Sequence, residues 1–155
     1  MERLVEEIQK IPEVAELLCC AEKGDCPAAM TGLGPVHRAH VSAALLKKSG
    51  GALLVVCSDE GEARRAAADL ESFTGTPAVM LPGREFRFHA AAVTSRGWEQ
   101  KRIEALYRIA AGQARLIVSA PDALLQCTMP GERLLDAAEC IVAEGAEKAM
   151  SRYNN

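Results

Sequence analysis

The chain has 155 residues, a formal net charge of −3 and 49% hydrophobic residues. This length suits one ordinary domain, and the apolar content excludes disordered and collagen-like chains. The acidic balance excludes a strongly basic nucleic-acid binder, and an aromatic content of 4% argues against a stacking platform for single strands. Any contact with DNA should therefore be local or weak.

The cysteines and the hydropathy pattern indicate a cytoplasmic protein. Six cysteines stand at positions 19, 20, 26, 57, 127 and 140, and the first residues show no secretory signal pattern. Charged or polar residues interrupt every apolar run before it reaches the roughly 18 residues that span a bilayer. We expect reduced thiols, no membrane contact and a cytoplasmic location.

The first third of the chain predicts two short helices and then a strand, a loop and a helix. Apolar residues recur at helical spacing over residues 1–21, and a Gly24–Pro27 break follows. The short apolar run Ala28–Thr31 predicts a strand. Gly32–Pro35 predicts a loop, and the pattern from about 38 to 48 predicts the next helix.

The middle of the chain alternates strands and helices. The continuous apolar run Ala52–Cys57 is typical of a strand buried on both faces. Ser58 or Asp59 can cap a helix that Gly75 ends, and a strand over 78–81 follows. Residues 82–97 show no period and predict a long loop.

The later elements complete an α/β fold. A helix from Trp98 to about Gly112, a strand over 115–119 and a short helix from Pro121 are predicted. Alternation with short connections implies right-handed crossovers and a parallel sheet flanked by helices.

The pattern changes after Pro130-Gly131, and the polar end of the chain is too short for a core of its own. We therefore predict N-terminal helices over 1–27, an α/β domain over 28–130, and over 131–155 the truncated start of a following domain. The run Glu139–Val142 predicts its first strand.

The segment from Gly32 to Ala39 has the place of a phosphate-binding loop but lacks its residues. Such a loop needs Gly-x-x-x-x-Gly-Lys-Ser/Thr between a strand and a helix, for phosphate and magnesium. Here Gly32 and Gly34 are present, but His37, Arg38 and Ala39 occupy the glycine, lysine and hydroxyl positions. ATP hydrolysis is therefore not expected, and no cofactor is predicted.

Two groups of polar residues near this segment could belong to a binding site or could simply be features of helix starts. Arg38 and His40 are compatible with a residual anion site, but a solvated helix start is the favoured interpretation. Asp59 and Glu60 resemble the acidic pair of an NTPase, but a helix cap explains them better.

Metal binding and nucleophilic catalysis have little support in the sequence. Cys19, Cys20, Cys26 and the pair His37 and His40 lack Cys-x-x-Cys spacing, so structural thiols are favoured and no metal site is predicted. The chain has no Gly-x-Ser-x-Gly elbow, and no catalytic residue is predicted.

The densest basic patch consists of Arg84, Arg87, Arg96, Lys101 and Arg102. These side chains could meet phosphates or an acidic protein surface. Interleaved glutamates favour a solvated mixed face instead.

Taken together, the chain resembles the N-terminal module of the bacterial transcription-repair coupling factors (the Mfd family), a module similar to the excision-repair helicase UvrB. The resemblance covers about residues 28–143. It rests on Thr31–Gly34, Asp59, Ala63, Asp69-Leu70, Leu81–Glu85, Arg102, Leu106, Ile117–Ser119, Ala123-Leu124 and Met129-Pro130.

This resemblance implies a degenerate P-loop NTPase-like or helicase-like fold, as in UvrB domain 1a, without catalysis of its own. In the family a distant motor hydrolyses ATP and translocates on DNA, while the N-terminal module serves recruitment and autoinhibition in nucleotide excision repair. The resemblance implies UvrA as a partner, mainly through the domain after Pro130, and RNA polymerase and DNA through other domains. The alternatives are a divergent P-loop NTPase that holds phosphate with Arg38, and a DNA-binding module.

Overall fold

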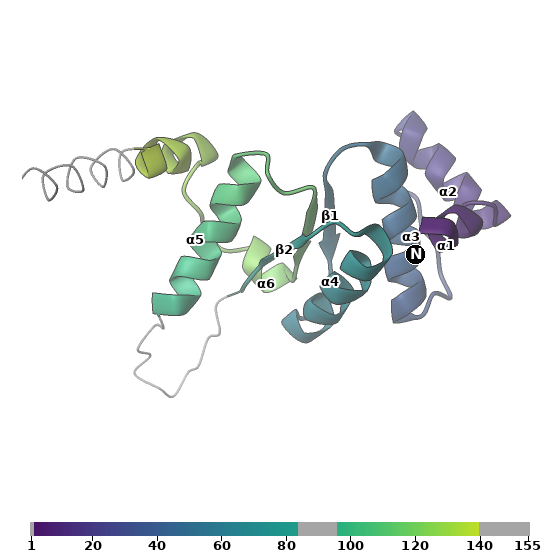
Figure 1. Ribbon diagram of the computed structural model, residues 1–155, viewed down its shortest axis with the longest axis horizontal. Coiled ribbons are helices and arrows are strands. Elements are labelled where there is room, and N and C mark those ends of the chain that lie inside the picture. Colours follow the sequence, from purple (N-terminus) through teal and green to yellow (C-terminus); the bar gives the residue numbers. More distant parts are fainter. Residues whose placement is uncertain (1, 84–95, 140–155) are drawn as a thin grey trace, which may run out of the picture.

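The computed structural model describes residues 2–83 and 96–139 (Figure 1). In chain order the elements are α1 (Glu2–Ile8), α2 (Pro12–Lys23), α3 (Pro35–Ser49), β1 (Leu53–Val56), α4 (Glu60–Thr74), β2 (Ala78–Leu81), α5 (Arg96–Ala110), β3 (Leu116–Ser119) and α6 (Pro121–Leu124). Residues 131–139 form a further helical segment. None of the helices within these ranges has both the length and the apolar composition needed to cross a membrane.

The three strands form one parallel sheet in the order β1-β3-β2. Leu53 and Ala78 both lie opposite Leu116, so the outer strands share one register against the central strand. The connections β1-α4-β2 and β2-α5-β3 each cross over through a helix, as parallel pairing requires. The prediction of an α/β fold with a parallel sheet flanked by helices is confirmed.

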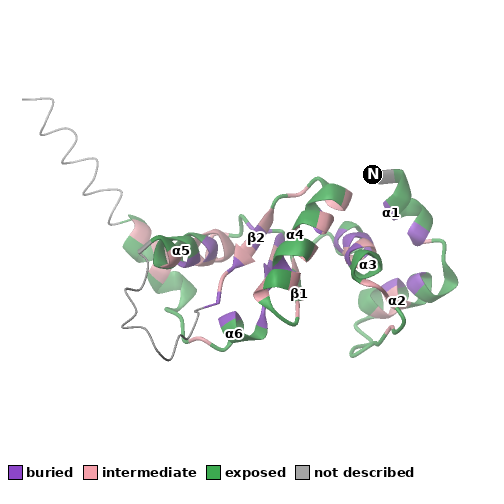
Figure 2. Cartoon of the chain, turned by 90° about the horizontal axis from the view of Figure 1, so that it is seen from below, coloured by how far each residue is buried: buried purple, intermediate pink, exposed green. Residues whose placement is uncertain are grey.

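One face of the sheet carries the larger core, which α3 and α4 cover. Alternate strand residues point toward this face, including Leu53 and Val55 of β1 and the fully buried Leu116 and Val118 of β3. Helices α1 and α2 pack behind α3, and their buried side chains join the same core (Figure 2). These side chains are Val5, Ile8, Val14 and Leu18.

The opposite face is covered over β2 and β3 only. Val79 and Leu81 of β2 pack there with side chains of α5 and with Ala123 of α6. On β1 the corresponding residues Leu54 and Val56 remain 48% and 50% exposed. The prediction that the run Ala52–Cys57 is buried on both faces is therefore wrong for this edge strand, because α5 and α6 pack on its neighbours.

The predicted strand over Ala28–Thr31 is also wrong. Residues 25–31 have no regular secondary structure, and Ala28 and Ala29 are exposed. Alanine is depleted in strands, and this short run contributes only Met30 to the edge of the core. Helix α3 consequently follows an irregular segment and not a strand. Of the strand predicted over 139–142, Glu139 is helical and the other residues lie outside the described ranges.

Candidate functional site

The predicted degenerate phosphate loop bends at Gly32 and leads into α3. Gly32 has a φ of 79°, a left-handed conformation that a residue without a Cβ adopts readily. Gly34 is the N-cap of α3, and Pro35 is its first residue. His37 is exposed, whereas Ala39 is 4% exposed and belongs to the core. The residue at the magnesium-ligand position therefore has a packing role.

Arg38 is paired with an acidic side chain from α4. Its Nη2 lies 2.8 Å from Oε1 of Glu62, whose side chain is only 18% exposed. The other oxygen, Oε2, accepts hydrogen bonds from the Ser58 amide at 3.0 Å and from the Ser58 hydroxyl at 2.5 Å. Glu62 therefore already balances the positive charge of Arg38, which could otherwise neutralise a phosphate at the start of α3.

Asp59 brings a second carboxylate to the same place. It is the N-cap of α4, where its Oδ1 accepts the Glu62 amide at 2.8 Å, so the predicted helix cap is confirmed. The backbone amide of Glu62 is the main cause that lowers the pKa of Asp59. The Ser58 hydroxyl is the main cause that lowers the pKa of Glu62, and Arg38 contributes. We call Arg38, Ser58, Asp59 and Glu62 the polar cluster.

The polar cluster offers no free positive charge to an anion. Glu62 faces the Arg38 guanidinium and Asp59 lies near the Arg65 guanidinium, so each cation already has a carboxylate close to it. Burial raises the pKa of the neighbouring Cys57, and Glu62 adds to that shift, so this thiol is not activated as a nucleophile. A hollow of about 910 Å³ beside the cluster is walled largely by apolar residues such as Leu17, Leu33 and Leu45.

His40 is not brought together with Arg38 at an anion site. Its ring stacks on Phe73 of α4, with ring centroids 4.7 Å apart and an angle of 9° between the planes. Its Nε2 donates to the Leu4 carbonyl oxygen at 2.9 Å. His40 therefore ties α1 to α3 and α4, and this geometry gives no support to a residual anion site, the less favoured of the two sequence interpretations.

Only part of the predicted basic patch lies within the described residues, and its members there differ in exposure. Arg84 and Arg87 lie outside the described residues, as does the side chain of Arg96 at the start of α5. Lys101 is exposed and lines a hollow along β2. Arg102 is only 7% exposed, so its assignment to a contact surface is wrong.

Arg102 joins β2 to α6. Its Nη1 donates to the Pro82 carbonyl at 2.7 Å, and its Nη2 donates to the Ala123 carbonyl at 3.1 Å. Burial lowers the pKa of Arg102, while Asp122 acts in the opposite direction. Next to this link Trp98 donates from Nε1 to the Gly83 carbonyl at 2.8 Å. These bonds fix the Pro82-Gly83 turn against α5 and α6.

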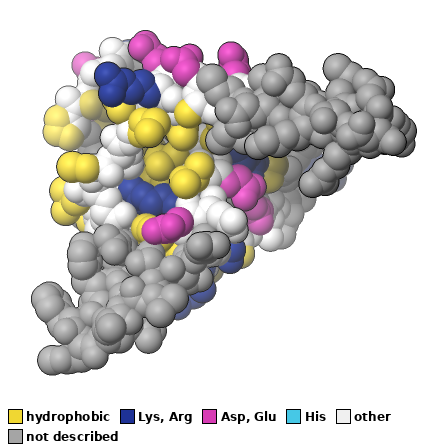
Figure 3. All heavy atoms as spheres, turned by 90° about the vertical axis from the view of Figure 1, so that its left-hand side faces the viewer, with side chains coloured by type: hydrophobic (Ala, Val, Ile, Leu, Met, Phe, Trp, Pro, Cys, Tyr) yellow, Lys and Arg dark blue, Asp and Glu magenta, His cyan; other side chains and the backbone are white. Residues whose placement is uncertain are grey.

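Sequence reasoning missed two cations beside Lys101. Arg64 of α4 and Arg108 of α5 line the same hollow, together with Glu60 and Glu104. Arg64 already pairs with Glu60 at 2.5 Å. Lys101, Glu104 and Arg108 are three and four residues apart in the sequence. This spacing is the signal that could have placed Lys101 and Arg108 on one helix face. Figure 3, which views this end of the molecule, shows basic and acidic side chains scattered around apolar ones.

The described residues form no candidate metal site. Among those residues no group of three or more histidine, cysteine, aspartate or glutamate side chains is placed to hold a metal ion. Cys19, Cys20, Cys26, Cys57 and Cys127 are free thiols.

Comparisons with protein-family models, with curated proteins and with solved structures return no match.

Proposed function

We propose that this chain is a non-catalytic scaffold and recruitment module in transcription-coupled nucleotide excision repair, the N-terminal part of a transcription-repair coupling factor. The family assignment depends on the motifs quoted from the sequence. In this proposal the parent protein is an ATP-dependent DNA translocase whose motor lies in other domains. UvrA, RNA polymerase and DNA are contacted mainly through those other domains.

The observation that supports the absence of catalysis is the pairing of Arg38 with Glu62 at 2.8 Å. The partner carboxylate is held in place by two hydrogen bonds from Ser58, so Arg38 has little positive charge to offer a phosphate, and Asp59 adds a second negative charge near Glu62. Ala39 contributes to the core and offers no hydroxyl to magnesium. A nucleotide would have to break the ion pair and approach two carboxylates.

Calorimetric titration with Mg-ATP tests the catalytic half of this proposal. We expect no binding heat at millimolar nucleotide and no phosphate release. The variant Glu62→Gln frees Arg38 while keeping a side chain of similar size, and we expect it to remain without turnover because the glycine, lysine and hydroxyl positions are still altered. Saturable Mg-ATP binding by the unmodified chain would favour the divergent NTPase alternative.

The recruitment half is tested in the longer protein that this proposal implies. Because α1 and α2 share the core of α3 and α4, the test deletion removes residues 1–130; it should leave the ATPase activity in place and reduce repair of the transcribed strand. Loss of ATPase activity on that deletion would contradict a purely scaffolding role. A fluorescence-anisotropy titration of this chain with duplex DNA at low salt should stay flat, since Lys101 and Arg108 are accompanied by Glu60 and Glu104.

A further inference from the structure

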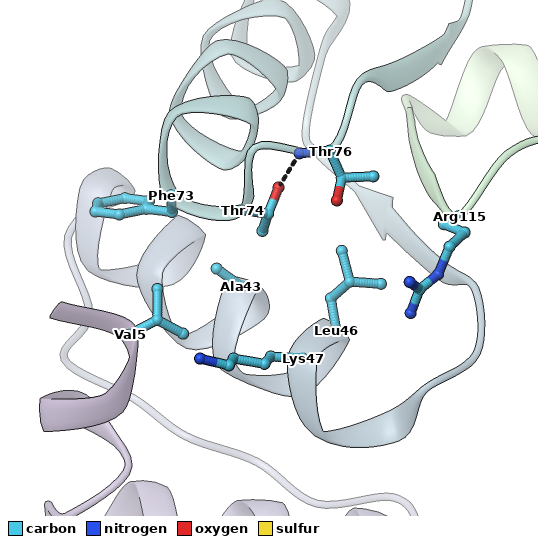
Figure 4. Close-up of a pocket in the computed structure, with 8 residues that line it drawn as sticks. All are labelled: Val5, Ala43, Leu46, Lys47, Phe73, Thr74, Thr76 and Arg115. Atoms are coloured by element: carbon cyan, nitrogen blue, oxygen red, sulfur yellow. Dashed lines mark hydrogen bonds between the residues drawn. The ribbon is translucent and has the colours of Figure 1, made fainter. Parts of the chain in front are cut away.

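A cavity of about 200 Å³ lies between α1, α3 and the end of α4, away from the polar cluster (Figure 4). Part of its wall is apolar: Val5 comes from α1, Ala43 and Leu46 come from α3, and Phe73 comes from α4. Val5, Ala43 and Leu46 are 2%, 0% and 3% exposed, so they are firmly held parts of the core. The cavity is therefore shaped by side chains that have little freedom to fill it.

The rim of this cavity is polar and basic. Lys47 and Arg115 line it together with Thr74 and Thr76. The Thr74 hydroxyl is already used, since it donates to the Leu70 carbonyl and accepts the Thr76 amide. Figure 4 shows the Thr76 hydroxyl above Leu46 and the Arg115 guanidinium beside it.

The two cations are held only by weak bonds. Arg115 donates from Nη2 to the Gly50 carbonyl at 3.3 Å, a long bond that leaves other guanidinium donors available. Lys47 forms an ion pair with Glu6 of α1 at 3.0 Å, and both side chains are about half exposed. Exposed ion pairs of this kind exchange readily for another carboxylate.

We propose that this cavity binds a small amphiphilic monocarboxylate, with the apolar body on Leu46 and Phe73 and the carboxylate on Arg115, while Lys47 adds positive charge from the side of the rim near α1. A cavity of roughly 150 Å³ holds benzene in other proteins, so this volume accommodates one ring or a short branched chain with its head group. The planar guanidinium fork matches a carboxylate. Glu6 beside Lys47 lowers the total positive charge, which disfavours a dianion such as phosphate.

Titration with benzoate, followed by methyl NMR of the whole chain, tests this inference. We expect saturable shifts at the methyl groups of Val5, Ala43 and Leu46, with a dissociation constant on the order of a millimolar for so small a ligand. Benzyl alcohol, the uncharged analogue, should bind at least about tenfold more weakly. A short peptide with a free or an amidated C-terminal leucine shows whether the carboxylate of a polypeptide can take the place of a free acid.

Four substitutions of exposed side chains are expected to change benzoate binding in different directions. Arg115→Gln should weaken benzoate binding about tenfold, because it removes a charge-assisted bond. Lys47→Gln should weaken it about threefold, because it removes a more distant positive charge. Glu6→Gln should tighten binding about twofold to threefold, since it releases Lys47. Lys48→Gln is the matched control: Lys48 follows Lys47 on α3, pairs with Glu22 of α2 and does not line the cavity, so binding should not change.

Three results would overturn the proposal. They are the absence of methyl shifts at about 20 mM benzoate, well above the expected dissociation constant, equal binding of benzyl alcohol, and equal effects of Arg115→Gln and Lys48→Gln. Each variant changes an exposed side chain, and a dispersed methyl spectrum verifies that it is folded. None of these results bears on the proposed repair function, which concerns the opposite end of α3.

Discussion

The two faces of the sheet are built from the same strands but are covered to different extents. On the first face α3 and α4 lie over all three strands, and α1 and α2 enlarge the core behind them. On the second face α5 and α6 cover β2 and β3, while Leu54 and Val56 of β1 stay half exposed. A strand sends alternate residues to opposite faces, so an apolar run alone does not establish that both faces are covered.

The two faces therefore differ in how much they contribute to stability and in where their polar side chains lie. The first face holds the fully buried residues Leu70, Leu116 and Val118, and the polar cluster lies at its edge where α3 and α4 begin. The second face depends on a smaller core and on the buried guanidinium of Arg102. Substitutions on the first face should therefore cost the most, and those on the open part of the second face the least.

Leu70→Ala should cause the largest loss of stability. Leu70 is fully buried on α4 at the centre of the first core, and removing its side chain leaves a cavity. We expect the free energy of unfolding to fall by about 2–5 kcal/mol, measured by urea denaturation. Leu125→Ala is the control, because this residue is 85% exposed and should change stability by less than about 0.5 kcal/mol. Similar losses in both variants would mean that α4 does not hold this core.

Arg102→Met should cause the next largest loss, on the second face. The methionine keeps the volume but leaves the Pro82 and Ala123 carbonyls without their donors. An unpaired buried acceptor costs about 1–3 kcal/mol, which chemical denaturation can resolve. Lys101→Met makes the same charge change at the exposed neighbouring position and should be nearly neutral. If Lys101→Met proved the more harmful variant, the structural role assigned to Arg102 would be wrong.

The elements that sequence could predict are those specified by local chemistry. Asp59 was predicted as a helix cap and Gly75 as a helix end, and both are found with the expected geometry. The strand over 78–81 has its predicted bounds, since β-branched and apolar residues there are flanked by Thr, Pro and Gly. These signals lie within a few residues of the structure they specify.

The features that sequence did not predict depend on packing between distant segments. Arg38 and Glu62 are separated by 24 positions, and nothing local indicates that α3 and α4 bring them together. Sequence alone groups Arg102 with the surface cations, because a charged residue is usually exposed. In the structure it is buried, and its guanidinium donates to carbonyls 20 and 21 positions away in the sequence. The apolar run at 28–31 suggested a strand, but pairing requires a partner strand that these residues do not meet.

The polar cluster makes part of the stability dependent on pH. The pKa values of Asp59 and Glu62 lie below their ordinary values of 3.8 and 4.5, so their ionised forms favour the folded state. This contribution is fully present above those ordinary values and is lost as the pH falls through the lowered values of the folded protein. The melting temperature should therefore decline below about pH 4.5.

Ser58→Ala tests this dependence because the Ser58 hydroxyl is the main cause of the lowered pKa of Glu62. At pH 7 the melting temperature should fall by roughly 2 °C, and the difference from the unmodified chain should shrink at pH 3. Ser49→Ala removes a hydroxyl that bonds only to the Leu46 carbonyl, so its effect should not change with pH. If the melting-temperature difference caused by Ser58→Ala also stayed constant with pH, the Ser58 hydroxyl would not be responsible for the lowered pKa of Glu62.

The smallest effect is expected at Val56, and it tests the difference between the two faces directly. Val56→Thr places a hydroxyl on the half-exposed side of β1, where water can solvate it, so stability should change by less than about 0.5 kcal/mol. Val55→Thr makes the same substitution one residue earlier, where the side chain packs against the first core, and should cost about 1–3 kcal/mol. If both variants lost stability equally, something would cover the open face in solution. A loss at Val56 that grew with protein concentration would then identify a second copy of the chain as the cover, because mass action stabilises an associated fold.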